Sequence, residues 1–239
     1  MIVAIHQPHY LPWAGYMDKL DRADAFVLLD TVQFTKSEWQ NRNRFKTAEG
    51  WQWVSVPVLH QHGQAIRDVQ IDPNQSTWPR KHRNALETNY SSTPHFARVA
   101  DGLFSLWEQE WASLGPLNRA TVELFAGLMG IDTPIHLASE MEATPEDPDE
   151  RLIALCRELG ADIYLAGAAG PDYMDMAKWG TAGIEVQVQE FVHPVYEQPF
   201  GDFLPGMSAA DLLCNCGPQA LPLLRSANGR VSLSNEDPS

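Results

Sequence analysis

The sequence predicts an α/β protein of the Rossmann-like class, in which helices flank a largely parallel sheet. Short apolar runs alternate with stretches of helical periodicity, and strands that are separated by helices pair in parallel. The runs of strand length are residues 2–6, 25–30, 134–138, 162–166 and 184–191. Two segments interrupt the alternation, a small β insertion at 51–71 and a helical segment at 78–129. We expect a single domain over residues 1–227 and a flexible tail over residues 228–239, where no periodicity continues.

The chain opens with a compact βαβ unit. The apolar run at 2–6 is followed by a polar turn, by apolar side chains at helical spacing over residues 16–23, and by the second run at 25–30. The turn at 6–13 is therefore expected at the carboxyl end of the first strand, which is where open parallel sheets bind their ligands.

The β insertion begins with an alternating stretch at 51–58. We expect this stretch to pair with residues 66–71 across the polar loop at 60–65. The pairing predicts a small mixed or antiparallel layer beside the main sheet.

The helical segment that starts at Trp78 contains two break signals, at 91–94 and near Gly115-Pro116, so three helices are expected there. Farther along the chain, further helices are predicted at 148–159 and at 208–216.

Charge is distributed unevenly along the chain. The 239 residues carry 17 Lys and Arg against 31 Asp and Glu, and the net charge of −14 argues against a general binder of nucleic acid or of anionic membranes. Residues 1–100 nevertheless hold 11 Lys and Arg against 9 Asp and Glu, whereas residues 101–239 hold 6 against 22. A binding site for an anion is therefore expected in the N-terminal part.

No segment approaches the ~18 consecutive apolar residues of a membrane span. The first residues also lack the basic start and the apolar stretch of a signal peptide. We therefore expect a cytoplasmic protein without membrane insertion. The sequence indicates no oligomeric state.

Polar and ring side chains are concentrated where the first strand is followed by the first helix. They are His6, Gln7, His9, Tyr10 and Trp13. The N-terminus of a helix offers unpaired N–H groups and a positive dipole end, which suit a phosphate or a carboxylate. Either histidine alone is more often a hydrogen-bonded core residue, but together at this position they favour a ligand site.

A basic segment follows the second strand. Residues 31–46 hold four Lys and Arg against one Glu. In an extended chain, Asn41 and Asn43 face one side while Arg42 and Arg44 face the other, where guanidinium groups can bind phosphate or carboxylate. The alternative is a solvated edge strand whose charges discourage pairing between sheets.

Further candidates lie later in the chain. Arg80 and Arg83 share one face of a helix, either as part of an anion site or as an exposed helix start. Gly167 follows a predicted strand and lets backbone approach a ligand, whereas His193 and Tyr196 follow the last predicted strand. In a parallel sheet these strand ends meet at the same rim.

The sequence resembles the WbqC-like family from about Ile2 to Gly217. The residues that carry the resemblance are His6-Gln7-Pro8, Tyr10-Leu11-Pro12-Trp13, Gly15-Tyr16, Asp30, Val32-Gln33, Asn41-Arg42-Asn43, Tyr164-Leu165, Gly167, His193-Pro194-Val195-Tyr196 and Gln198. That family is linked to gene clusters for bacterial O-antigen and other surface polysaccharides, and transfer of glycine or another aminoacyl group has been suggested for its members. The resemblance implies the same context for this chain.

The opening unit is also similar to that of the HIGH-type nucleotidyltransferases. In that group, histidines at the first helix N-terminus stabilise the charge that develops on a transferred nucleotide phosphate. This chain departs from the pattern, because Leu11-Pro12 and Gly15-Tyr16 stand where a compact x-Gly-His is expected.

The leading hypothesis is an enzyme that binds a nucleotide or a nucleotide-activated sugar and transfers or activates an acyl or aminoacyl group. The ligand is expected to be a small anion (a nucleotide, a nucleotide-sugar or a carboxylate), and ATP or another nucleotide with Mg²⁺ is the consistent cofactor. The expected catalytic residues are His6, His9, Asp30 and His193. The expected substrate-binding residues are Gln7, Tyr10, Trp13, Gln33, Lys36, Asn41, Arg42, Asn43, Arg44, Arg80, Arg83, Gly167 and Tyr196.

In this hypothesis, His6 and His9 stabilise phosphate or transfer protons, since imidazole titrates near neutral pH. Asp30 accepts a ribose or sugar hydroxyl or anchors a metal, and Tyr10 and Trp13 offer a surface for stacking.

Two other functions use the same features. A metal-dependent hydrolase would use the four expected catalytic residues as ligands, although His-x-x-His at the end of an extended strand is a poor arrangement for one ion. A non-catalytic sugar-nucleotide sensor or assembly protein would use an aromatic surface formed by Trp51, Trp53 and Trp78, residues that more often pack in a core.

Overall fold

A five-stranded sheet in the order β7-β2-β1-β8-β9 forms the centre of the computed structural model, which describes residues 1–142 and 145–229. The strands are β1 (Ile2–His6), β2 (Ala25–Leu28), β7 (Ile135–Leu137), β8 (Ile163–Ala166) and β9 (Glu185–Val188). Every neighbouring pair in this sheet is parallel, which confirms the Rossmann-like α/β prediction. Most of the tail that was predicted at 228–239 lies outside the described residues.

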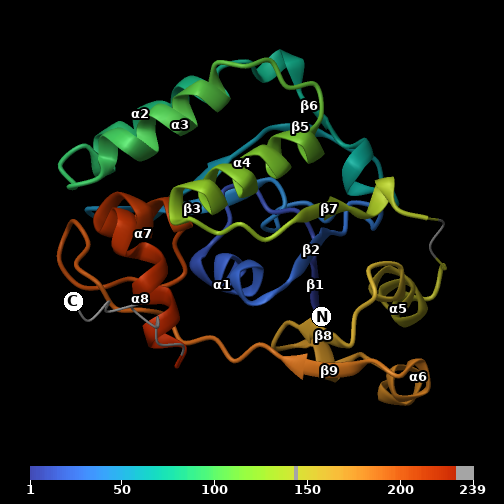
Figure 1. Cartoon of the computed structure of the whole chain (residues 1–239). Helices are drawn as coiled ribbons and strands as arrows, with labels where there is room; N and C mark the ends of the chain where they lie inside the picture. Colours follow the sequence, from blue (N-terminus) through green and yellow to red (C-terminus); the bar gives the residue numbers. More distant parts are fainter. Residues whose placement is uncertain (143–144, 230–239) are drawn as a thin grey trace, which may run out of the picture.

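Helices cover both faces of the sheet (Figure 1). One face carries α1 (Ala14–Arg22), α4 (Leu114–Met129), α7 (Ala209–Cys216) and α8 (Ala220–Ala227), and the other carries α5 (Pro148–Glu158) and α6 (Met176–Ala182). Strand residues alternate between the two cores, because successive side chains of a strand point to opposite faces. In β1, for example, Ala4 packs in one core whereas Val3 and Ile5 pack in the other.

The direction in which the sheet grows reverses between β1 and β8. From β1 the chain proceeds to β2 on one side, and from β8 it proceeds to β9 on the other. Loops that leave the carboxyl ends of these two strands diverge, and a crevice opens between them. The strand ends at this point are His6 and Ala166.

The β insertion is arranged differently from the prediction. The strand β4 (Gly50–Ser55) pairs with β3 (Arg42–Thr47) in an antiparallel hairpin, so the expected pairing of 51–58 with 66–71 is wrong for most of its length. Only its end forms that contact, as β5 (Val58–Leu59) with β6 (Gln70–Ile71). The tight turn before Gly50, whose φ is 118°, closes the hairpin at short range.

The helical segment contains three helices, as predicted: α2 (Trp78–Tyr90), α3 (Phe96–Trp107) and α4. The first break lies where it was expected. The second lies earlier, since Gly115-Pro116 occupies the first turn of α4, where a proline is tolerated because the first N–H groups of a helix have no intrahelical acceptor. The described part of the chain also contains five short 3₁₀ segments, at Ile66–Asp68, Pro73–Gln75, Ala138–Glu140, Gly170–Asp172 and Gly217–Gln219.

Among the described residues, no helix combines the length and the apolar character needed to cross a membrane.

The loop between β1 and α1 is held by buried carboxamides from outside the βαβ unit. The Asn43 Nδ2 group, on β3, donates to the carbonyl oxygens of Leu11 at 2.7 Å and of Tyr10 at 3.3 Å. The Asn118 Nδ2 group, on α4, donates to the carbonyl oxygens of Pro8 at 3.2 Å and of Gln40 at 2.7 Å. We call these interactions the carboxamide clamp.

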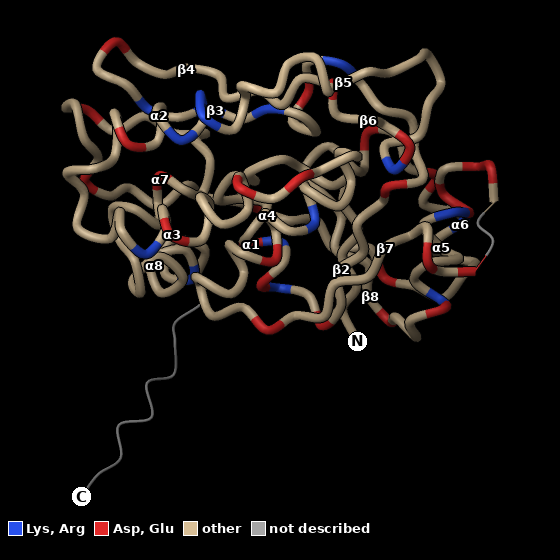
Figure 2. Tube along the Cα trace, turned by 90° about the horizontal axis from the view of Figure 1, so that it is seen from above, with Lys and Arg blue, Asp and Glu red and all other residues tan. Residues whose placement is uncertain are grey.

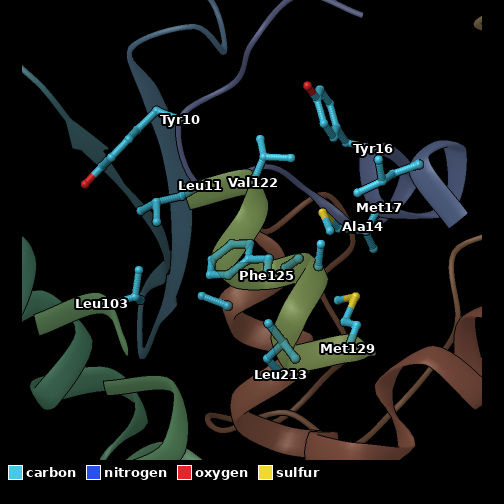
Figure 3. Close-up of a cluster of buried hydrophobic side chains, with 14 of the residues drawn as sticks. Tyr10, Leu11, Ala14, Tyr16, Met17, Leu103, Val122, Phe125, Met129 and Leu213 are labelled. Carbon is cyan, nitrogen blue, oxygen red and sulfur yellow. The ribbon is translucent and has the colours of Figure 1, made fainter. Parts of the chain in front are cut away.

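The clamp holds a strained residue. Leu11 has a φ of 47°, a conformation that side chains other than glycine rarely adopt, and its N–H donates to the Thr121 hydroxyl. Its side chain is buried beside Val122 and Phe125 of α4 (Figure 3). Side chains of β3 and of the helical segment thus fix the shape of the loop at the sheet's carboxyl end.

We expect Asn43→Ala to lower the free energy of unfolding by about 1–3 kcal/mol, because two buried carbonyl groups lose their donor. Urea unfolding followed by circular dichroism measures the change. Asn84→Ala, on the exposed side of α2, is the matched control and should stay within about 0.5 kcal/mol. Equal effects of the two substitutions would contradict a stabilising role for the clamp.

Candidate functional site

A cavity of about 380 Å³ opens where the sheet reverses direction, between the carboxyl ends of β1 and β8. We call this cavity the crevice. Its walls come from β1, α1, the loop after β2, α5 and the loop after β8. The lining residues are Ile5, His6, Gln7, Lys19, Leu29, Val32, Pro148, Arg151, Leu152, Tyr164, Gly167 and Tyr173.

Three rings pack together at the edge of the crevice. The ring of His6 lies 4.7 Å from that of His9 and 4.7 Å from that of Tyr16, and the rings of His9 and Tyr16 are 5.1 Å apart. The His9 Nδ1 atom and the Tyr16 hydroxyl are buried, and neither has a hydrogen-bond partner among the described residues. Buried polar atoms in native proteins are usually paired, so these two atoms are exceptions beside the crevice.

Both histidines are neutral at pH 7. Burial lowers the pKa of His9 to about 3, and burial with the nearby His9 and Lys19 lowers the pKa of His6 well below its usual value. The His6 Nδ1 atom lies 3.1 Å from the carbonyl oxygen of Gln7, which can only accept, so Nδ1 carries the proton. The Nε2 atom of His6 is therefore a hydrogen-bond acceptor.

A buried lysine projects from α1 into the same cavity. The Lys19 ammonium donates to the carbonyl oxygen of Ile5 at 2.8 Å, and it lies 5.9 Å from the ring centre of Tyr164. Its side chain is 2% exposed, and burial lowers the pKa of Lys19 to about 7. Near neutral pH this group is thus present both as a cation and as a free amine.

The lining of the crevice is cationic although the whole chain is acidic. Arg151 lines it together with Lys19. The guanidinium of Arg151 donates to the carbonyl oxygens of Pro145 and Glu146, and it forms no ion pair with a carboxylate of the described residues. Among the residues that the structure describes, no Asp or Glu lines the cavity. The crevice is therefore suited to an anion.

Two positions in the crevice can accommodate a ligand directly. The Oε1 atom of Gln7 accepts from Gln40 Nε2 at 2.7 Å, which orients the amide so that the Nε2 group of Gln7 remains a donor. A Cβ atom built on Gly167 meets no atom within 4 Å, so ligand can approach the backbone closely at this position.

The predicted substrate-binding residues do not gather in one place. Lys36, Asn41 and Arg42 line a second cavity of about 710 Å³, which we call the basic cavity, between the β3–β4 hairpin and α2. Figure 2 shows Lys and Arg positions along β3 in this part of the molecule. The segment 32–42 contributes Val32 to the crevice and four other residues to the basic cavity, and no described residue lines both cavities.

Two of the predicted residues lie in the core instead. Asn43 belongs to the carboxamide clamp. The Tyr10 hydroxyl accepts from Trp107 Nε1 and donates to His82 Nδ1, both at 2.8 Å, and the other nitrogen of His82 faces the carbonyl oxygen of Ser55 at 3.2 Å. Tyr10 is fully buried and offers no stacking surface.

Asp30 follows β2 and is 3% exposed. Its carboxylate accepts from the N–H of Ser139 at 2.9 Å and from the hydroxyl of Ser139 at 2.6 Å. The structure therefore places Asp30 at the start of a 3₁₀ segment after β7 rather than in the lining of either cavity.

The residues after β9 form a separate group. Trp13 lies 5.0 Å from Phe191 and 6.4 Å from His193, and His193 Nε2 accepts from the N–H of Gly206 at 3.1 Å. The Tyr196 hydroxyl donates to the fully buried Asp211 at 2.7 Å. These side chains join α7 to the sheet.

The remaining predicted residues line neither cavity. Arg44 is half-buried, and its guanidinium lies 4.9 Å from the rings of Trp39 and Trp51 and 5.3 Å from that of Trp53. Arg83 is ion-paired with Glu87 and Glu108. Arg80 and Gln33 are exposed.

Three charged residues that line the two cavities were not predicted as site residues: Lys19, Lys81 and Arg151. The signal at Lys19 was a charged residue three positions after Tyr16, on the apolar face of a predicted helix. A lysine in that position needs either a partner or a function. The residues that Arg151 contacts lie in the loop before α5, and no pattern in the sequence indicates these contacts.

No three His, Cys, Asp or Glu side chains come together as metal ligands in the described part of the chain. His6 and His9 lie at the crevice, whereas Asp30 and His193 are hydrogen-bonded elsewhere. The residue set suggested for a metal-dependent hydrolase therefore does not form one site.

Comparison with known proteins assigns the chain to a family. The protein "Uncharacterized protein Rv1507c" of Mycobacterium tuberculosis (strain ATCC 25618 / H37Rv) is 37% identical over 227 residues, which are 93% of this chain and 97% of that protein. The 23S rRNA (uracil(1939)-C(5))-methyltransferase RlmD of Pseudomonas entomophila (strain L48) is 32% identical over 134 residues, which are 49% of this chain but 29% of the methyltransferase. No solved structure matches. A profile of the WbqC-like protein family matches residues 7–222, and the chain belongs to this family.

Proposed function

We propose that the protein is an enzyme whose crevice binds a nucleotide or a nucleotide-activated sugar, and that it transfers or activates an acyl or aminoacyl group such as glycyl. The observation that carries the proposal is the crevice itself, where Lys19 and Arg151 line a cavity without carboxylates at the reversal point of a parallel sheet. Sheets of this class bind nucleotides at that point. The surface-polysaccharide context comes from the family resemblance.

The structure supports a division of roles that differs from the one in the sequence hypothesis. An imidazole with a pKa near 3 is a weak base, so His9 serves as a neutral hydrogen-bonding group. Lys19, with a pKa near 7, is the better proton acceptor. As an amine or hydroxyl attacks the acyl carbon, its proton passes to Lys19 in those complexes in which Lys19 is the free amine, and the leaving group departs with the bonding electrons toward the cation of Arg151.

A Mg²⁺ ion that accompanies ATP is usually bound by one or two carboxylates besides the phosphates. The lining of the crevice offers none among the described residues. The residues present do not fit a protein-bound Mg²⁺, and the proposed roles involve none.

Isothermal titration calorimetry with ATP, UDP and UDP-glucose tests ligand binding in the crevice. We expect at least one of them to bind, and we expect Gly167→Ile to weaken that binding by about tenfold, because the new side chain fills the cavity. Gly127→Ile, at an exposed position of α4 with nothing within 4 Å of its Cβ, is the control. Absence of binding by all three compounds at millimolar concentration removes the basis of the proposal.

The pH dependence of binding tests the role of Lys19. A bound anion favours the charged lysine and raises its pKa above about 7, so binding takes up a proton at higher pH. The affinity for UDP-glucose, whose pyrophosphate does not titrate in this range, should fall by about tenfold between pH 6 and pH 8. Lys19→Met should bind with the same low affinity at both values, and a pH-dependent affinity in this variant would contradict the assignment.

The glycan product formed in cells distinguishes a catalytic function from binding alone. Mass spectrometry of surface glycans should show loss of an acyl or aminoacyl substituent in cells that carry Lys19→Met, while the purified variant still matches the wild type in binding at pH 8. A substituent that persists at its normal level would favour a non-catalytic sensor or assembly role.

A further inference from the structure

We propose that the basic cavity is a second binding site, which takes an anionic sugar such as a sugar phosphate or a uronic acid. It is distinct from the crevice, and the proposal does not depend on what the crevice binds. The cavity holds about 710 Å³, within the usual range for small-molecule sites.

Three cations line the basic cavity: Lys36, Arg42 and Lys81. No Asp or Glu lines it among the described residues. Three positive charges without a carboxylate repel one another, and a bound anion offsets this repulsion.

Arg42 is held in place before any ligand arrives. Its guanidinium carbon lies 3.9 Å from the ring centre of Trp53, and its Nη2 group donates to the carbonyl oxygen of Ser37. Its Nε atom is buried and has no partner among the described residues. A fixed guanidinium with an unused donor is preorganised for a phosphate or a carboxylate.

Lys81 lies near the N-terminus of α2, a position that is electrostatically unfavourable for a cation. Arg80 and Lys81 lie in the first turn of α2, which has no acidic residue, although cations are unfavourable at the positive end of a helix. Unfavourable placements of this kind occur mainly where a function offsets their cost in free energy. An anion in the cavity would supply that compensation for Lys81, which lines it.

The lining of the basic cavity also includes oxygen acceptors. The Asp72 carboxylate accepts from Asn74 Nδ2 at 3.1 Å and from Gln75 Nε2 at 2.9 Å, so the amide oxygens of both residues are the ends left for a ligand. Asn41 donates to the carbonyl oxygen of Val56, while its Oδ1 atom is buried without a partner among the described residues. At 9% exposure, Asn41 offers a fixed acceptor in the cavity wall.

Cations and amide oxygens in one lining fit a ligand that is both an anion and a donor of hydroxyl hydrogens. A simple inorganic anion uses only the cations, and a neutral sugar only the oxygens. Both together match an anionic sugar.

Titration calorimetry with glucose 6-phosphate, glucuronate, glucose and inorganic phosphate tests the site. We expect glucose 6-phosphate or glucuronate to bind, and glucose and inorganic phosphate to bind at least about tenfold more weakly. The stronger of the two charged sugars identifies phosphate or carboxylate as the anionic group.

Lys81→Gln and Arg42→Gln should each weaken this binding by about tenfold or more. Arg80→Gln is the matched control, since Arg80 precedes Lys81 in the same helix turn, is exposed and does not line the cavity. Gly167→Ile should leave the affinity unchanged, which separates this site from the crevice.

Three outcomes overturn the proposal: no binding of either charged sugar at about 10 mM, inorganic phosphate binding as tightly as glucose 6-phosphate, or equal losses in Arg80→Gln and Lys81→Gln. The second would show a general anion site, and the third would show attraction by surface charge alone.

Discussion

The carboxamide clamp is the interaction on which the rest of the structure depends. The loop from β1 to α1 has no regular ladder of hydrogen bonds, and a buried carbonyl group without a donor costs free energy. Asn43, on β3, and Asn118, in the helical segment, supply those donors. The β3–β4 hairpin and the helical segment therefore support the crevice, because they fix the conformation of the loop between His6 and the first helix.

The two cavities differ in charge from the chain as a whole. A chain with a net charge of −14 forms two cavities whose described lining contains cations and no carboxylates. Acidic side chains elsewhere do not oppose a small anion in these cavities, since charges beyond about 10 Å are screened at ordinary ionic strength. Of the cations that line the two cavities, only Arg151 comes from outside residues 1–100.

Much of the fold follows from local patterns, whereas the site depends on contacts between distant residues. The strands of the main sheet and three central helices were predictable because their periodicity is strong. The partner of β4 was not, since a two-residue turn makes a hairpin with a segment that reads as a charged loop. Asp30 at a strand end suggests chemistry, but its carboxylate is occupied by Ser139, 109 residues away. The role of Lys19 was not predicted, because α1 was predicted from the spacing of its apolar residues.

One side chain connects the loop after β1 with the segment before the basic cavity. Gln40 donates to Gln7, which lines the crevice, and accepts from the N–H of Thr35 at 2.9 Å, immediately before Lys36 of the basic cavity. A change of side chain at position 40 therefore removes the support of both segments at once, so its effect on one cavity cannot be separated from its effect on the other.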